Sequence, residues 1–159
     1  MSTLNESLAR LFRELVDGAP KDGAFMLNGG DPGLLRSLES LDAAAASAPS
    51  PSGGASIAAH VDHLRYGISL MNRWSDGDPD PWAGADWTES WKRTAVTEAE
   101  WAALRNQLLT EVRRWQEALT SPRSLETIEL DGVIGSVAHL AYHLGAIRQI
   151  DRSLRGPAA

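Results

Sequence analysis

The stretch "SVAHLAYHLGAIRQI", residues 136–150, is mostly apolar and places His139 and His143 four positions apart. Four residues make about one turn of an α-helix, so both imidazoles would leave the same side of a helix. The flanking apolar residues repeat with the same period and form a stripe beside the histidines: Val133, Leu140, Leu144 and Ile147. This pattern predicts a helix from about Val133 to Leu154 with two histidines on its inner face.

A second histidine-bearing helix is predicted from Ser56, a good N-cap residue, to about Trp74. At 100° per residue, His60 and His63 lie about 60° apart, and both fall inside the apolar arc of this helix. The opposite, polar side would carry Asp62, Arg65, Ser69, Asn72 and Arg73. These two pairs are the four histidines of the chain, and all of them are therefore predicted to face the core.

Two further long helices complete the pattern, one over residues 3–16 and one from about Thr97 to Leu119. Thr97 and Glu100 have the spacing of a capping box. A shorter helix is expected within residues 33–46. The segment "SLETIEL", residues 124–130, alternates like a strand, but it has no partner strand and is expected to be an extended connector.

The fold predicted from these elements is all-α, a four-helix bundle formed by one domain over residues 1–159. The loop of about 20 residues between the second and third long helices is longer than a tight antiparallel connection needs. It therefore leaves room for a crossover, and a simple up-down-up-down order is not assumed.

Composition excludes several classes of function. The net charge is −6 and no cluster of Lys or Arg occurs, which argues against nucleic acid as a partner. No apolar run approaches the roughly 18 residues of a membrane span, and the amphipathic N-terminus is unlike a signal peptide. The chain lacks cysteine, which removes disulfides and thiolate metal sites. We therefore expect a cytoplasmic protein with no membrane partner.

Histidines on two facing helices of a bundle can converge on one metal ion. Uncharged imidazole suits Zn, Ni, Cu or Fe, whereas Mg and Ca prefer oxygen ligands. The zinc-protease signature is excluded because Leu140, not Glu, follows His139. The competing interpretation is that each histidine is a hydrogen-bonded core residue.

The loop between the second and third long helices carries three tryptophans, Trp82, Trp87 and Trp91. Rings of this size are expected to cover something, either as the wall of a pocket or as a cap or dimer contact. Arg148 and Arg152 would either meet an anionic substrate group or form a solvated face.

The segments "SIAAHVDHL", "ADWTESW…VTEAEW" and "HLAYHLG" together resemble the DinB-like (DinB/YfiT) superfamily. The resemblance implies a four-helix bundle with a crossover connection and a divalent metal, Ni or Zn, held by three histidines. It assigns the ligand on the second helix to His63, seven residues after Ser56, and the remaining two to His139 and His143. Where many members have Gln, this chain has Ala146, so no role of that Gln is carried over.

His60 is not assigned by the resemblance. It is expected to support the metal site by a hydrogen bond, to replace His63 as the ligand, or to fill the core.

The resemblance also implies a reaction class, because characterised relatives include thiol S-transferases. We therefore expect a metal-dependent enzyme that activates a water or a low-molecular-weight thiol for transfer or hydrolysis on a small molecule. The alternative is a non-catalytic metal- or ligand-binding bundle, a sensor or an interaction module that forms a homodimer. The sequence names neither the substrate nor a general base.

Overall fold

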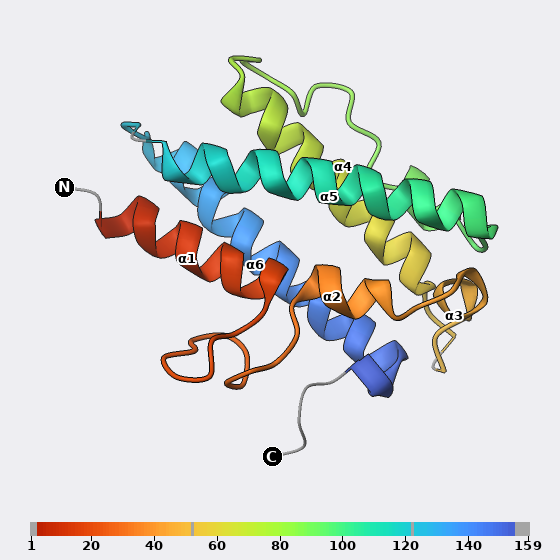
Figure 1. Ribbon diagram of the computed structural model, residues 1–159. Helices are drawn as coiled ribbons and strands as arrows, with labels where there is room; N and C mark the ends of the chain where they lie inside the picture. Colours follow the sequence, from red (N-terminus) through yellow and green to blue (C-terminus); the bar gives the residue numbers. More distant parts are fainter. Residues whose placement is uncertain (1–2, 52, 122, 155–159) are drawn as a thin grey trace.

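A computed structural model describes residues 3–51, 53–121 and 123–154 (Figure 1). The four long helices are α1 (Thr3–Asp17), α4 (Ile57–Ser75), α5 (Glu98–Thr120) and α6 (Thr127–Ile150). The short elements are the α-helices α2 (Leu34–Glu39) and α3 (Ala43–Ser47) and the 3-10 helices η1 (Glu89–Lys92) and η2 (Arg152–Leu154). Within the described residues the regular elements are all helical, so the predicted all-α class is confirmed.

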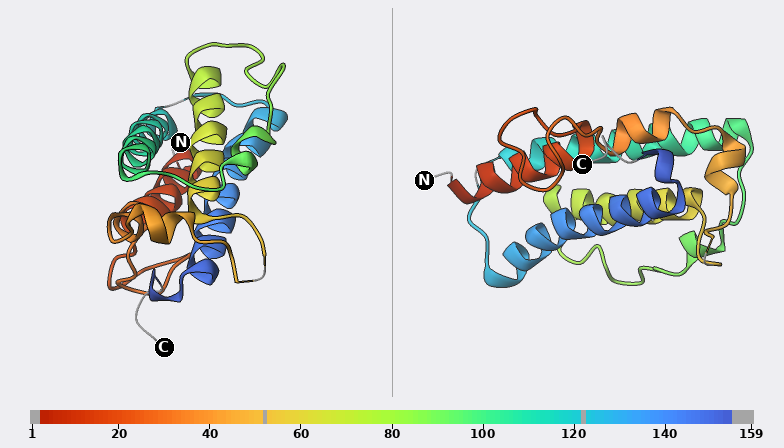
Figure 2. Two further views of the ribbon diagram at one scale, coloured as in Figure 1. Left: turned by 90° about the vertical axis from the view of Figure 1, so that its right-hand side faces the viewer. Right: turned by 90° about the horizontal axis from the view of Figure 1, so that it is seen from below.

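The bundle is formed by the long helices, with α4 packed against α5 and α6, and α1 packed against the same two. Figure 1 and the right view of Figure 2 show α4 and α5 running in the same general direction. The segment that connects α4 to α5, residues 76–97, returns along the outside of the bundle. It carries η1 and the tryptophans Trp82, Trp87 and Trp91. The core between the helices includes the fully buried side chains of Phe12, Leu64, Trp101, Trp115 and Leu140.

Helix ends follow local sequence signals. The Ser56 hydroxyl accepts a hydrogen bond from the Ala59 N–H at 3.2 Å and caps α4. Thr97 and Glu100 form the predicted capping box at the start of α5. Gly18 ends α1 with φ at +114°, a conformation that favours glycine.

The expectation for residues 124–130 was wrong from Thr127 onward, because α6 begins there. Glu126 and Glu129 form a reciprocal capping box, in which Glu126 N–H donates to the Glu129 carboxylate at 2.8 Å. Two glutamates thus cap the backbone N–H groups at this helix start. α6 therefore starts six residues earlier than predicted and ends at Ile150, not Leu154.

The predicted single short helix within residues 33–46 is also corrected. It is two helices, because the Asp42 side chain accepts from the Ala45 N–H at 2.8 Å and starts α3 as a new helix.

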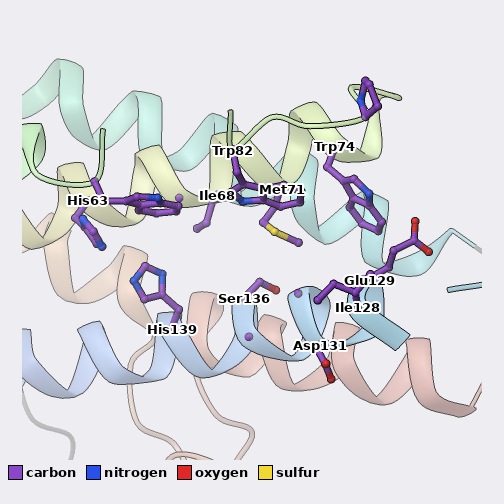
Figure 3. Close-up of a pocket in the computed structure, with 15 residues that line it drawn as sticks. His63, Ile68, Met71, Trp74, Trp82, Ile128, Glu129, Asp131, Ser136 and His139 are labelled. Carbon is purple, nitrogen blue, oxygen red and sulfur yellow. The ribbon is translucent and has the colours of Figure 1, made fainter. Parts of the chain in front are cut away.

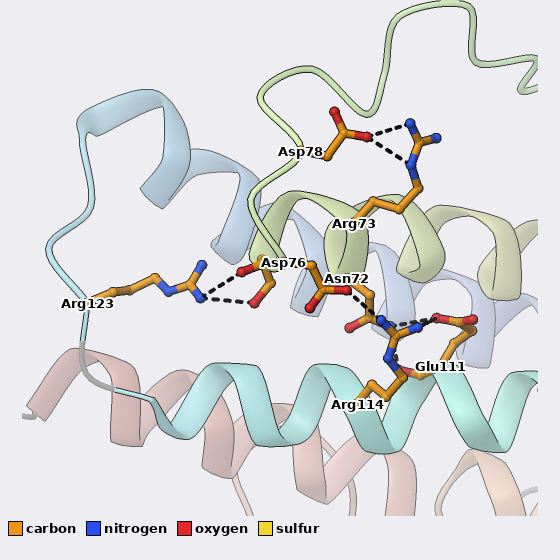
Figure 4. A network of polar contacts seen from close by, with 8 residues as sticks. Asn72, Arg73, Asp76, Asp78, Glu111, Arg114 and Arg123 are labelled. Atoms are coloured by element: carbon orange, nitrogen blue, oxygen red, sulfur yellow. Dashed lines mark hydrogen bonds and ion pairs between the residues drawn. The ribbon is translucent and has the colours of Figure 1, made fainter.

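Two residues assigned to the polar side of α4 are buried, Asp62 and Asn72. The Asn72 amide donates to the Glu111 carboxylate at 2.6 Å and to its carbonyl at 3.0 Å, which joins α4 to α5 (Figure 4). Asp62 pairs with Arg65 at 2.9 Å and with Arg93 at 2.8 Å. The prediction from helical periodicity, that this side of α4 faces solvent, was wrong at these two residues because α5 and the segment over residues 76–97 cover them.

Arg148 contributes to the fold rather than to a solvated face or a ligand site. Its guanidinium donates to the Asp31 carboxylate at 3.2 Å and to the Pro32 carbonyl at 2.7 Å, and its side chain is 13% exposed. This contact ties the loop before α2 to the end of α6.

Among the described residues, no helix is both long enough and apolar enough to cross a membrane.

Candidate metal centre and adjoining cavity

Three imidazoles from two helices converge on one point inside the bundle. His63 comes from α4, and His139 and His143 come from successive turns of α6. One ring nitrogen of each lies within 4.8 Å of the other two. Nitrogens that share one tetrahedral ion, each about 2.0–2.1 Å from it, lie about 3.3 Å apart, so small side-chain rotations would close the triangle.

His143 stands at the centre of this group. Its Nε2 atom lies 2.9 Å from Nε2 of His139, and its Nδ1 atom lies 2.8 Å from Nδ1 of His60. If Nε2 of His143 binds an ion, Nδ1 of His143 carries the proton and donates a hydrogen bond to Nδ1 of His60. His60 therefore lies behind His143, where it fixes the orientation of that imidazole.

His63 is oriented in the same way by a hydroxyl group. Its Nδ1 atom lies 3.1 Å from Oγ of Ser90, which leaves Nε2 available as the ligand atom. Ser90 is buried in η1, and no spacing rule in the sequence pointed to it. The pair between Arg93 and Asp62 holds η1 against α4 and so fixes the position of Ser90.

The environment keeps these imidazoles neutral. Burial, together with the neighbouring histidines, lowers the pKa of His63 to about 4 and that of His143 to about 3. Burial also lowers the pKa of His60 and of His139. Neutral imidazole is the form that binds a metal, so at neutral pH the group has the required protonation state.

The three loop tryptophans occupy different positions around the histidines. Trp91 stacks on His63, with ring centroids 4.4 Å apart and planes at 28°, and it also faces His143 at 5.9 Å. Trp87 lies beside His63 at 5.7 Å. Trp82 and Trp87 line the adjoining cavity, whereas Trp91 covers the imidazoles themselves.

A cavity of about 630 Å³ extends away from His63 and His139 between α4 and the first half of α6 (Figure 3). Its walls are mostly apolar and aromatic: Ile68, Met71, Trp74, Trp82, Trp87 and Ile128. The volume is in the range of small-molecule sites. Two of the converging imidazoles thus form one end of a cavity that can hold a small molecule.

Comparison with known proteins places this arrangement in a family. A family model described as the DinB superfamily matches residues 32–147, which include all four histidines and more than half of the chain. Neither a curated protein nor a solved structure matches the chain significantly. The chain belongs to the DinB superfamily.

Proposed function

We propose that this protein is a metal-dependent enzyme in which His63, His139 and His143 hold a divalent cation, Zn or Ni. The observation that carries the proposal is the convergence of three neutral imidazoles, within 4.8 Å of one another, at the end of a cavity. An imidazole-only set suits these metals rather than Mg or Ca. Three protein ligands leave at least one coordination position open, as catalytic sites require.

A cation in this position would supply Lewis acidity that lowers the pKa of a water or of a low-molecular-weight thiol. The remaining roles belong to the chain. Ser90 and His60 hold the imidazoles of His63 and His143 in the orientation for binding. Trp91 shields these rings from water on one side. The cavity beyond His139 would hold the small molecule that is hydrolysed or that accepts the thiol.

Elemental analysis of the full-length protein after loading with Zn or Ni tests the metal site. We expect about one ion per chain in the wild type, and none in the His63→Ala, His139→Ala and His143→Ala variants, each checked for helicity by circular dichroism. The His60→Ala variant should retain the ion with affinity lowered by about 10- to 100-fold, because it removes a supporting bond rather than a ligand. Loss of the ion in His60→Ala with retention in His63→Ala would show that His60, and not His63, is the ligand on α4.

Activity separates the enzyme from a metal-binding module without catalysis. The loaded protein is assayed for hydrolysis of aryl esters and amides and for transfer of several low-molecular-weight thiols to electrophiles. Turnover in the wild type that disappears in His143→Ala supports the proposal. A stoichiometric ion without turnover in any of these assays would favour the non-catalytic alternative, a sensor or interaction module.

A further inference from the structure

The described charged residues that line the cavity beside the histidines are all acidic. Among its described lining residues there are two carboxylates, Glu129 and Asp131, and neither lysine nor arginine. The whole chain is also acidic, with a net charge of −6. The Asp131 carboxylate points away from the cavity (Figure 3), so an anionic ligand would meet no lysine or arginine on the described cavity wall and one carboxylate, Glu129, that repels it.

The aromatic wall of the cavity also favours a cationic ligand over an anionic one. The faces of indole rings attract cations, and Trp gives the strongest effect of the aromatic residues. Trp82 and Trp87 are each about two-fifths exposed although they line the cavity. The ring of Trp74 already accepts a cation from outside the cavity, because the Arg123 guanidinium carbon lies 4.9 Å from its centroid.

The ends of the cavity differ. His63 and His139 stand at one end, and Trp74, Ile128 and Glu129 stand at the other (Figure 3). Glu129 uses one carboxylate oxygen to cap α6. In the described part of the chain, no salt bridge joins this carboxylate to a lysine or arginine. A negative charge thus lies at the end farthest from the imidazoles, beside the indole ring of Trp74, which also meets the Arg123 guanidinium.

We infer that the cavity binds a small organic cation, an amine with an aromatic or aliphatic body. The body lies against Ile68, Met71 and Trp82, and the ammonium group lies near Glu129. The opposite end of the molecule points to His63 and His139. The inference rests on the proposed function for what happens at the histidine end. The preference for a cation depends on the cavity alone.

Three matched probes test this preference: phenylbutylamine, phenylbutanol and phenylbutyrate, which share a body and differ in the charge of one end. Binding to the full-length protein is measured by quenching of tryptophan fluorescence and by calorimetry. The protein is used both metal-loaded and after removal of metal, since a bound cation would itself attract the carboxylate. We expect the amine to bind the metal-free protein at least about tenfold more tightly than the carboxylate, with the alcohol between them.

The Glu129→Gln variant locates the charge that matters. Gln keeps the capping interaction of α6 and removes the charge, so amine affinity should fall by roughly threefold while binding of the alcohol stays unchanged. Glu100→Gln is the matched control, because Glu100 has the same capping role on α5 and does not line the cavity. A Trp82→Ala variant should weaken all three probes by removing the shared wall.

Equal binding of amine and carboxylate by the metal-free protein, or tighter binding of the carboxylate, would overturn the inference. Failure of all three probes to bind at millimolar concentration would overturn it as well. A metal titration of the same preparation separates the two claims. If the ion binds to the histidines and the probes do not discriminate by charge, the ligand class fails and the proposed metal site stands.

Discussion

Two of the three imidazoles of the proposed site, those of His63 and His143, are oriented through the ring nitrogen that faces away from the other ligands. For His63 that partner is the Ser90 hydroxyl at 3.1 Å, and for His143 it is Nδ1 of His60 at 2.8 Å. Such partners fix the tautomer and the direction of the ligand atom, and they raise its basicity. The chain supplies these partners from η1 and from α4, the element that also carries His63.

Replacing Ser90 by Ala should weaken metal binding by about 10- to 100-fold, because His63 loses the bond that orients it. Ser90→Thr, which keeps the hydroxyl, should restore most of the affinity. Dissociation constants from competition with a chelating dye measure the effect. Ser69→Ala is a matched control, since in the described part of the chain the Ser69 hydroxyl bonds within α4, to the Tyr66 carbonyl. Affinity unchanged in Ser90→Ala would show that the hydroxyl does not support the site.

The pKa shifts of the histidines predict how stability depends on pH in the metal-free protein. In the native state the pKa of His63 is lowered to about 4 and that of His143 to about 3, whereas histidine in an unfolded chain titrates near 6.5. Between about pH 6.5 and pH 4 the unfolded chain therefore binds protons that the native protein does not. The free energy of unfolding should fall as the pH is lowered through this window.

Urea denaturation across that window measures the slope. A His63→Asn, His143→Asn double variant should show a shallower dependence, because it removes the two groups with the largest shifts. Stability that stays constant from neutral pH to about pH 4 would mean that these imidazoles are not buried as neutral groups.

At the level of single residues, the sequence predicted which histidines face the core. It did not predict which of them bind the metal and which support a ligand. Helical geometry placed His60 and His63 on the same arc, and only the resemblance favoured His63 as the ligand. The structure separates them through partners from other elements, Ser90 from η1 and His143 from α6. Contacts between residues far apart in the chain leave no trace in local periodicity, which is why Ser90 was missed.

Glu14 shows how a helix holds a loop in place. Its buried carboxylate at the end of α1 accepts hydrogen bonds from the backbone N–H groups of Phe25, Met26 and Leu27, at 2.7–3.1 Å. Burial opposes ionisation of Glu14, but these three bonds lower its pKa overall. Glu14 thus holds the middle of the loop over residues 19–32, and Arg148 holds its end.

Glu14→Ala should lower the free energy of unfolding by about 1–3 kcal/mol, because the loop N–H groups lose their acceptor. Chemical denaturation at neutral pH measures the change. The exposed Glu117 on α5 provides the control, since Glu117→Ala removes a carboxylate of the same type from solvent. Equal stability of the two variants would contradict the anchoring role of Glu14.

At the level of elements, strong local signals were predicted well. Ser56 and the Thr97–Glu100 pair were correct because capping is a contact within one helical turn. The start of α6 was missed because residues 124–130 alternate between polar and apolar like a strand. The polar side of α4 was misassigned at Asp62 for a different reason, since the returning segment that covers it is distant in sequence.

In the molecule as a whole, the proposed ligands come from α4 and α6 and meet only when the bundle is folded. A cation held by all three should therefore stabilise the native state against the unfolded chain. At a free Zn concentration of about 100 times the dissociation constant, the free energy of unfolding should rise by about 2.7 kcal/mol.

Thermal and urea denaturation with and without Zn measure this rise. The His143→Gln variant should show none of it, and Mg should have no effect on the wild type because it disfavours imidazole ligands. An equal gain in the variant would mean that the ion binds elsewhere.

The crossing of the chain over the bundle explains how the site is completed. Because α4 and α5 run in the same direction, the segment between them returns along α4 and carries Ser90 and Trp91 over the histidines (Figure 2). The length of this loop suggested such a path, but the contacts that it makes could not be predicted. Family membership and the helical class follow from the sequence, whereas the cavity and its charge follow only from the packed structure.

If three imidazoles hold one ion and leave part of its coordination sphere open, the ligands of the bound metal must show both features. X-ray absorption spectroscopy at the metal edge of the Zn- or Ni-loaded, full-length protein tests this directly by counting the ligands and identifying imidazole. We expect three imidazoles about 2.0–2.1 Å from the metal together with at least one oxygen donor from solvent. A spectrum with four imidazoles and no solvent donor, or with oxygen donors alone, would contradict this arrangement.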